Sequence, residues 1–307
     1  MKNIWKIIVI GVIIGLALMM TGFLTGARIF NVVGFGRNAV TLGEVPLRGM
    51  PGIISNVMNW NHGFRHDVDI DFQAAGERQT IALNDNVTNI DISAVSANIE
   101  FVHSNDYRVE IINRNNNRAP IRYSVDDNVL IITQDTFISF GVNLQRNDSI
   151  TVFLPSHIDL DSVDVRTVSG NITLNEVTSY DMRISATSGA VRLDSVTVDN
   201  MSISVISGSI RADNLKTERL IADTISGSTT ISGELRGDTS IDTTSGTVRV
   251  TVLPRGMAVN SHISVLSGNI NVNGERISGR THTFDSRGYT DSNIIISTLS
   301  GNVHLDF

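Results

Sequence analysis

Hydrophobic residues recur at fixed distances from a Ser-Gly pair in the second half of the chain. Seven such units carry the pair, with serines at positions 169, 188, 207, 226, 245, 267 and 300, and the first four intervals are each 19 residues. The position four residues before each serine is always apolar, as in Ile184 and Ile203. The positions three and five residues after the serine are apolar too, with Thr229 as the one exception. Residues two apart share one face of a strand, so each unit has an inward-facing strand on either side of the pair.

The length of the repeat restricts the fold. A crossover helix needs a dozen or more residues, so a 19-residue unit has no room for two strands and a helix. The units must therefore coil directly and stack as parallel strands. This predicts an all-β fold, a single-stranded β-solenoid (β-helix) with 19-residue coils. An antiparallel sandwich with regular turns is the alternative, which the constant spacing disfavours.

Each Ser-Gly pair is predicted to form a corner between two strands. Glycine adopts backbone angles that other residues reach only with strain, and a serine hydroxyl can bond to nearby backbone at a bend. The predicted structural corners are Ser169, Gly170, Ser188, Gly189, Ser207, Gly208, Ser226, Gly227, Ser245, Gly246, Ser267, Gly268, Ser300 and Gly301.

A less regular β section precedes these repeats. Alternation begins near Val87, and the segment around Ser96 matches the repeat with alanine in place of glycine, which predicts a first coil. Strand-like segments, which we expect to form hairpins, follow at 107–112, 119–124, 128–133 and 149–155. The solenoid domain is thus predicted over 88–307, with the first coil and the hairpins in 88–162 and the Ser-Gly repeats in 163–307.

The beginning of the chain predicts a membrane anchor. Residues 7–24 carry no charge and would span about 27 Å as a helix, close to the thickness of a bilayer core. Two lysines precede this stretch, so we expect a cytoplasmic N-terminus at 1–6, a single transmembrane helix at 7–27 and an extracytoplasmic remainder at the cell membrane. A cleaved signal peptide, ending in the small residues 25–27, is the alternative and also exports the chain. Residues 28–87, with prolines, glycines and asparagines but no sustained period, predict a juxtamembrane stalk or cap.

Composition removes several classes of function. The chain has no cysteine, which excludes disulfides, thiolate metal sites and a lipidated cysteine. The formal net charge is -7 and there is no Lys/Arg-rich run, so a nucleic-acid partner is not expected. The membrane, through the N-terminal helix, and an envelope polymer or a membrane protein are the expected partners.

Two groups of residues invite a metal-binding interpretation. A polar column stands six residues after each serine: Asn175, Asp194, Asp213, Ser232, Thr251, Asn273 and Asp306. Three carboxylates in seven positions supply too few hard oxygens for a calcium ladder, so we expect a second, polar corner. His62 and His66 lie close to Asp67, Asp69 and Asp71, but strand alternation would place them on different faces, and a solvated strand edge is expected.

Catalysis is not predicted. A glycosidase needs two neighbouring carboxylates, and the outward aspartates are scattered through the units: Asp164, Asp181, Asp199, Asp223 and Asp242. Aromatic residues that could stack on sugars are rare in the repeats, and the corner serines lack a nucleophile motif with a nearby histidine. We expect no enzyme activity, no catalytic residue, no cofactor and no metal, and a polysaccharide-active β-helix enzyme is the least favoured function.

The combination of an N-terminal apolar segment, a strand in SITVFLPSHIDLDSVDV and TVSGNITL-type units at 19-residue steps resembles the bacterial "putative adhesin" β-strand-repeat family, over about residues 88–307. That family, a domain of unknown function, has repeats that typically read SGDI. This chain has Asn, Ala, Ser or Thr where those repeats carry Asp, so no role of that acidic column is transferred.

The resemblance implies a membrane-anchored extracytoplasmic protein, an adhesin or an envelope-binding scaffold. LiaG-like relatives accompany envelope-stress regulators, so an accessory to a stress-sensing system is the alternative function. A cytoplasmic self-assembling filament would fit the fold but conflicts with export.

Overall fold

Parallel strands in 19-residue steps build the domain. The computed structural model describes residues 73–114, 120–134, 148–286 and 290–307, which belong to the unit Gly49–Phe307. These residues form strands without a helix, as the all-β prediction required. The strands are β1 (Gln73–Ala74), β2 (Arg78–Ala82), β3 (Asn89–Ala94), β4 (Asn98–His103), β5 (Arg108–Ile112), β6 (Ile121–Asp126), β7 (Val129–Gln134), β8 (Ser149–Leu154), β9 (Leu160–Thr167), β10 (Ile172–Asn175), β11 (Thr178–Ser188), β12 (Val191–Asp194), β13 (Thr197–Ser207), β14 (Ile210–Ser226), β15 (Thr229–Ser245), β16 (Val248–Val252), β17 (Val259–Ser267), β18 (Ile270–Val272), β19 (Glu275–Ile277), β20 (Thr281–Phe284), β21 (Ser292–Ser300) and β22 (Val303–Asp306).

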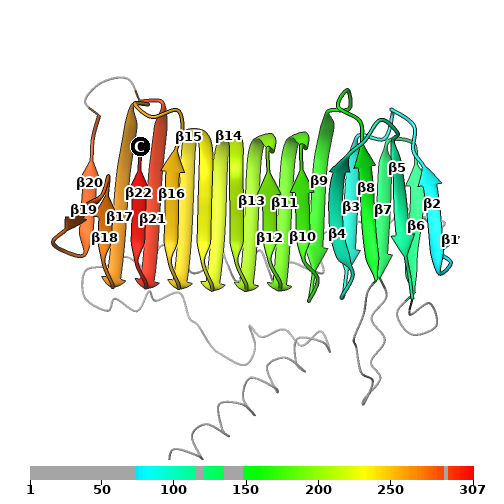
Figure 1. Ribbon diagram of the computed structural model, residues 1–307, viewed down its shortest axis with the longest axis horizontal. Helices are drawn as coiled ribbons and strands as arrows, with labels where there is room; N and C mark the ends of the chain where they lie inside the picture. Colours follow the sequence, from blue (N-terminus) through cyan, green and yellow to red (C-terminus); the bar gives the residue numbers. More distant parts are fainter. Residues whose placement is uncertain (1–72, 115–119, 135–147, 287–289) are drawn as a thin grey trace, which may run out of the picture. The chain divides into compact units, whose positions relative to one another are not determined.

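Each coil contributes one strand segment to each of two sides. The segments that lead into a Ser-Gly corner form the entry side, which runs through β9, β11, β13, the second halves of β14 and β15, β21 and β17. The segments that follow the corner form the exit side, through β10, β12, the first halves of β14 and β15, β16, β22 and β18. All these neighbours pair in parallel, as the repeat predicts (Figure 1).

The core lies between the two sides. The predicted apolar columns are buried, and two further buried positions per coil follow the second corner, for example Val196 and Val198. Thr229, the exception in the apolar pattern, is fully buried and its hydroxyl lies 3.0 Å from the hydroxyl of Thr224. Because the two hydroxyls satisfy each other across the Ser-Gly corner, the polar residue is accommodated in the core.

The Ser-Gly corners stack through their backbones. The N–H groups of Gly208 and Gly227 donate to the carbonyl oxygens of Ser226 and Ser245 in the next coil, at 3.0 Å in both cases. A Cβ on Gly227 would lie 1.6 Å from the carbonyl oxygen of Gly208, so the close approach of the coils requires glycine. Among the seven corner serines, all described, only Ser169 uses its hydroxyl in a hydrogen bond, to a backbone carbonyl of the neighbouring coil.

The second corner follows the polar column. Glu176, Ser195 and Asn214 have φ values of 54°, 56° and 55°, in the left-handed region that short polar residues tolerate better than bulky ones. They stand directly after Asn175, Asp194 and Asp213, respectively. β14 and β15 continue from the exit side into the next entry side as single long strands.

The coils at the C-terminal end are not stacked in chain order. β21 pairs with both β15 and β17, and β22 pairs with both β16 and β18. The coil at Ser300 therefore lies between the coils at Ser245 and Ser267, and Figure 1 shows it in red between orange and yellow strands. Antiparallel β19 and β20 then cover the outer edges of β18 and β17.

The N-terminal end has a comparable arrangement. The predicted first coil, β3–β4, pairs with β9–β10 on one side and with β7–β8 on the other. The segments 128–133 and 149–155, expected as hairpin strands, thus also form a parallel coil, although β5 and β6 pair antiparallel with β8 and β7. β1 and β2, within the predicted stalk or cap, pair with β6 and β5.

A glutamine side chain of this outer coil caps the neighbouring corner at residues 95–97. The Oε1 atom of Gln134 accepts hydrogen bonds from the N–H groups of Val95, Ser96 and Ala97, at 2.9, 3.0 and 3.2 Å. Its Nε2 group donates to Asp148 at 3.1 Å. Gln134 is only 6% exposed, so these bonds satisfy backbone groups that water reaches poorly.

The predicted transmembrane helix at 7–27 and the N-terminus at 1–6 lie outside the described residues, as does most of 28–87. Within the described part of the chain, no helix has the length and apolar character to span a bilayer.

Candidate functional site

The predicted repeat corners do not gather into a site. Their serines and glycines lie along one edge of the stack, where from Gly189 onward the glycine N–H groups donate to serine carbonyl oxygens of neighbouring pairs. The candidate histidines, His62 and His66, lie outside the described residues. Any specific surface in the described region must therefore lie on the outward positions of the strands.

Outward charges on the exit side are arranged as neighbouring opposites. Arg192 and Arg211 are register partners in one outward column, and Asp194 and Asp213 are partners in the column two residues further on. The Nε atom of Arg211 lies 2.7 Å from a carboxylate oxygen of Asp213. Because the positive and negative groups alternate over short distances, this side carries no strong field of one sign.

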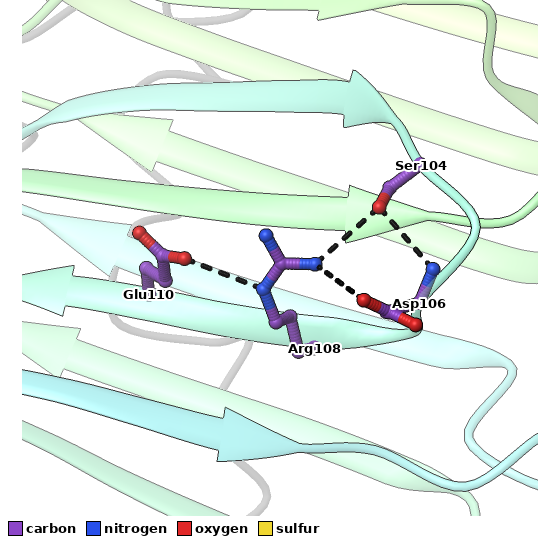
Figure 2. Close-up of polar contacts among 4 residues, drawn as sticks. All are labelled: Ser104, Asp106, Arg108 and Glu110. Atoms are coloured by element: carbon purple, nitrogen blue, oxygen red, sulfur yellow. Dashed lines mark hydrogen bonds and ion pairs between the residues drawn. The ribbon is translucent and has the colours of Figure 1, made fainter.

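An arginine near the N-terminal end of the stack is also engaged locally, in the network that Figure 2 shows. Arg108, on β5, lies 3.3 Å from Glu110, 3.4 Å from Asp106 and 3.4 Å from the hydroxyl of Ser104. Its guanidinium carbon lies 3.8 Å from the centre of the Phe153 ring. The network holds the turn between β4 and β5 and leaves the guanidinium with little spare capacity for a ligand.

The entry side carries an outward column in which several side chains are nevertheless buried. Its members stand three residues before each corner serine: Arg166, Ser185, Ser204, Asp223, Asp242, Ser297 and Ser264. Alternation places them on the side of the strand away from the core, because the residues before and after them point inward. Ser204 is nevertheless only 2% exposed and Asp223 only 4% exposed.

At one end of this column, the carboxylates of Asp91 and Asp164 both contact the buried Arg166. Arg166 forms an ion pair with Asp164 and lies 3.4 Å from Asp91, and Arg183 lies 3.7 Å from Asp164. Burial raises the pKa of Asp164 to about 6, and the positive charge of Arg166 opposes this rise. This cluster supplies its own counter-charge, so it has the character of a structural ion-pair network.

Asp223 and Asp242 form a different arrangement in the middle of the column. They are register partners in adjacent strand segments of β14 and β15, which lie about 4.8 Å apart. Burial raises the pKa of Asp223 to about 7, and the negative charge of Asp242 adds to the rise. Burial also raises the pKa of Asp242, against hydrogen bonds from Ser297 and Ser240.

Exposed apolar side chains flank this carboxylate pair. Ile221 is 39% exposed and Ile295 is 41% exposed, and both are register partners of Ser240. They lie in the outward column directly beside the one that holds Asp223 and Asp242. Leu266, 42% exposed, lies on the coil at Ser267, in the outward column on the other side of the buried one. Sequence reasoning named both aspartates but treated them as scattered, although their identical distance from the corner serine already placed them side by side.

Comparison with known proteins gives a family and no ligand. A model described as "Toastrack DUF4097" matches residues 87–276. No curated protein matches the sequence.

Solved structures of bacterial proteins are similar at low identity. A "putative cell adhesion protein" from Clostridium sporogenes is 15% identical, with 76% of this chain and 99% of that chain covered and a TM-score of 0.38. A "putative adhesin" from Bacteroides fragilis is 13% identical, with 77% and 97% covered and a TM-score of 0.40. A "putative lipid binding protein" from Parabacteroides distasonis is 15% identical, with 76% and 98% covered and a TM-score of 0.29. These values carry no conclusion about what this chain binds.

Proposed function

Because the chain belongs to the Toastrack DUF4097 family, with residues 87–276 matching its model, we propose that it is a membrane-anchored extracytoplasmic binding protein of the bacterial cell envelope. In this proposal the segment 7–27 anchors the chain and the β-solenoid presents the entry side to an envelope partner. The uncharged stretch behind two lysines supports the anchor, and the absence of cysteine is compatible with export.

The observation that carries the binding role is the apolar exposure on the entry side. Ile221, Ile295 and Leu266 are each about 40% exposed, and they lie on three coils that span part of one continuous sheet face. Ile221 and Ile295 flank the buried polar column on one side and Leu266 on the other, and exposed apolar side chains grouped on one face mark surfaces that partners cover. Stacked repeats commonly present such extended surfaces for binding.

A binding role is favoured over a glycosidase role by the surroundings of the carboxylate pair. A glycosidase also uses two neighbouring carboxyl groups, one of them protonated, as its catalytic groups. In the described coils from Leu160 to Ser300, however, the two outward columns beside Asp223 and Asp242 contain no phenylalanine, tyrosine or tryptophan. A sugar ring would find no stacking partner there.

Retention on isolated cell envelopes tests the proposal. The full-length protein and the double variant Ile221→Ser/Ile295→Ser would be incubated with washed envelopes from a strain that lacks the protein. We expect the double variant to be retained several-fold less. Val125→Ser is the matched control, since Val125 is 38% exposed but lies on β6 at the other end of the stack. Equal retention of the double variant and the native protein would contradict a role for the entry side, and resistance of the solenoid to protease on intact cells would contradict its extracytoplasmic location.

A further inference from the structure

The coil at Ser300 fills a space between two coils that precede it in the chain (Figure 1). Its strands β21 and β22 pair in parallel with β15 and β16 on one side and with β17 and β18 on the other. Without this coil, the coils at Ser245 and Ser267 would face each other with two unpaired strand edges each. A free strand edge is a template for another strand. The space therefore accepts the segment β21–β22 from whichever copy of the chain supplies it.

Buried hydroxyl groups without a hydrogen-bond partner gather at the contacts of this coil. Among the described residues, nine buried side-chain polar atoms have no such partner, and five of them belong to β21 or to residues directly opposite it: Thr239, Thr243, Ser261, Ser292 and Thr298. Each of these five residues is no more than 5% exposed. A hydroxyl buried in this way loses its hydrogen bonds to water and gains none in return, which destabilises the contact. The coil therefore gains less from its insertion than its strand pairing alone would give.

The same positions are apolar where coils follow one another in chain order. In β11 and β13, the inward columns of Thr239 and Thr243 contain methionine, alanine and valine, all buried: Met182, Met201, Ala186 and Val205. The contact of β11 with β13 is thus apolar at these positions, whereas the contacts of β21 are the least well satisfied part of the described core. We expect the coil at Ser300 to separate from its neighbours at a lower free energy than the coils in the middle of the stack.

The connection that precedes β21 is long enough for a second copy to supply the coil. β20 ends at Phe284 and β21 begins at Ser292, so residues 285–291 connect them and reach at most about 27 Å when extended. This reach is more than twice the distance of about 10 Å between two packed sheets. Two copies that lie side by side can therefore exchange this coil while the rest of each stack stays intact. In the proposed anchored state one membrane holds both copies, which raises their local concentration and favours the exchange.

We propose that two copies of this chain exchange the coil at residues 292–306, so that each coil fills the space between β15–β16 and β17–β18 of the other copy. The exchange keeps every strand pair of the single chain and costs little for that reason. It also makes the apolar surface of the entry side a product of two chains. Ile295 lies on β21, whereas Ile221 and Leu266 lie on β14 and β17, so each surface takes its Ile295 from the second copy. The exchange itself does not depend on the proposed binding role.

Disulfide trapping between two single-cysteine variants tests the exchange. Ser264 on β17 and Ser297 on β21 are register partners, so their Cα atoms lie within the range that a disulfide spans, and the chain has no cysteine of its own. Full-length Ser264→Cys and Ser297→Cys, with different affinity tags, would be co-expressed and oxidised. We expect a covalent dimer that carries both tags. Ser185→Cys with Ser204→Cys is the matched control, since these register partners occupy the same column in β11 and β13, and this mixture should form no covalent dimer.

The rate at which chains exchange gives a second readout. Differently tagged full-length proteins would be purified and mixed, and the appearance of dimers with both tags followed over time. Thr243→Val/Thr298→Val removes two unpaired hydroxyls, which stabilises the inserted coil and should slow the appearance of mixed dimers by about tenfold or more. Thr224→Val/Thr229→Val makes the same chemical change at two hydroxyls that bond to each other, and it should leave the rate unchanged.

Several results would overturn the inference. If Ser264→Cys/Ser297→Cys in one chain forms its disulfide within that chain while the two single variants give no covalent dimer, the coil fills the space of its own chain. Equal crosslinking of the control mixture would show that the dimers arise by collision. A native protein that is monomeric by light scattering would reject the exchange whatever the thiols show. If retention on envelopes depends on Ile221 and Ile295 although the protein is monomeric, the proposed function stands and the exchange fails.

Discussion

Replacing Asp223 by asparagine should stabilise the free protein at neutral pH. In the unfolded chain an aspartate ionises near pH 4, whereas the folded environment raises the pKa of Asp223 from 3.8 to about 7. Between these values the folded state holds a proton that the unfolded state has lost. The native protein therefore loses stability as the pH rises through this window, and the loss is complete above about pH 7. Asparagine has the same size but does not ionise, so the stability of the variant should not fall as the pH rises.

The expected magnitude follows from the width of the window. A pKa raised by about three units corresponds to about 4 kcal/mol of unfolding free energy. Because Asp223 and Asp242 repel each other and titrate as a pair, we expect Asp223→Asn to be more stable than the native protein by about 2 to 4 kcal/mol above pH 7. Urea unfolding of the native protein and Asp223→Asn across about pH 4 to about pH 8 measures the difference in midpoint and slope. The two proteins should be equally stable at the acid end and diverge as the pH rises. A difference that does not change with pH, or a less stable variant at pH 8, would refute the reasoning, and Asp181→Asn provides the control for a change of charge at the surface.

Three further substitutions test the interior of the fold by the same unfolding measurement. Gly227→Ala places a methyl group against the backbone of Gly208 in the preceding coil and should prevent folding or cost more than about 4 kcal/mol. Gly76→Ala, with no atom within 4 Å of the added Cβ, should be tolerated. Thr229→Val leaves the hydroxyl of Thr224 buried alone and should cost about 1 to 2 kcal/mol, and the double replacement by valine should recover most of the loss. Gln134→Leu leaves three backbone N–H groups without an acceptor and should lower the free energy of unfolding by about 2 to 4 kcal/mol. An unchanged unfolding midpoint would contradict the role of Gln134 at the corner.

The sequence predicted the coil well because its evidence is periodic. Apolar columns at fixed distances from the corners predict which residues are buried, and parallel pairing of Ile184 with Ile203 agrees with the 19-residue step. The order of the coils could not be predicted in the same way. Ile296 occupies the same column as Ile241 and Ile263, so any of these coils could be the neighbour of another on the basis of pattern alone.

The candidate site was predictable only in part. The common distance of Asp223 and Asp242 from their corner serines places them next to each other in any stack of equal coils. Their burial was not predictable, because strand alternation assigns an outward position to solvent. The role of Gln134 was not predictable for another reason: a single polar residue at the end of a strand gives no periodic signal, and the three N–H groups that it bonds lie 37 to 39 positions away in the chain.

The insertion of the coil at residues 292–306 between two earlier coils has a consequence for how the domain is made. During synthesis the coil at Ser267 emerges before its final neighbour exists, and a space one strand wide must be kept or reopened until β21 and β22 arrive. This end of the stack therefore cannot grow vectorially, one coil upon the last, as a simple repeat array does. Evolution can lengthen such an array freely in its middle, where each 19-residue unit contacts only its sequence neighbours, but the interleaved end behaves as one indivisible cap.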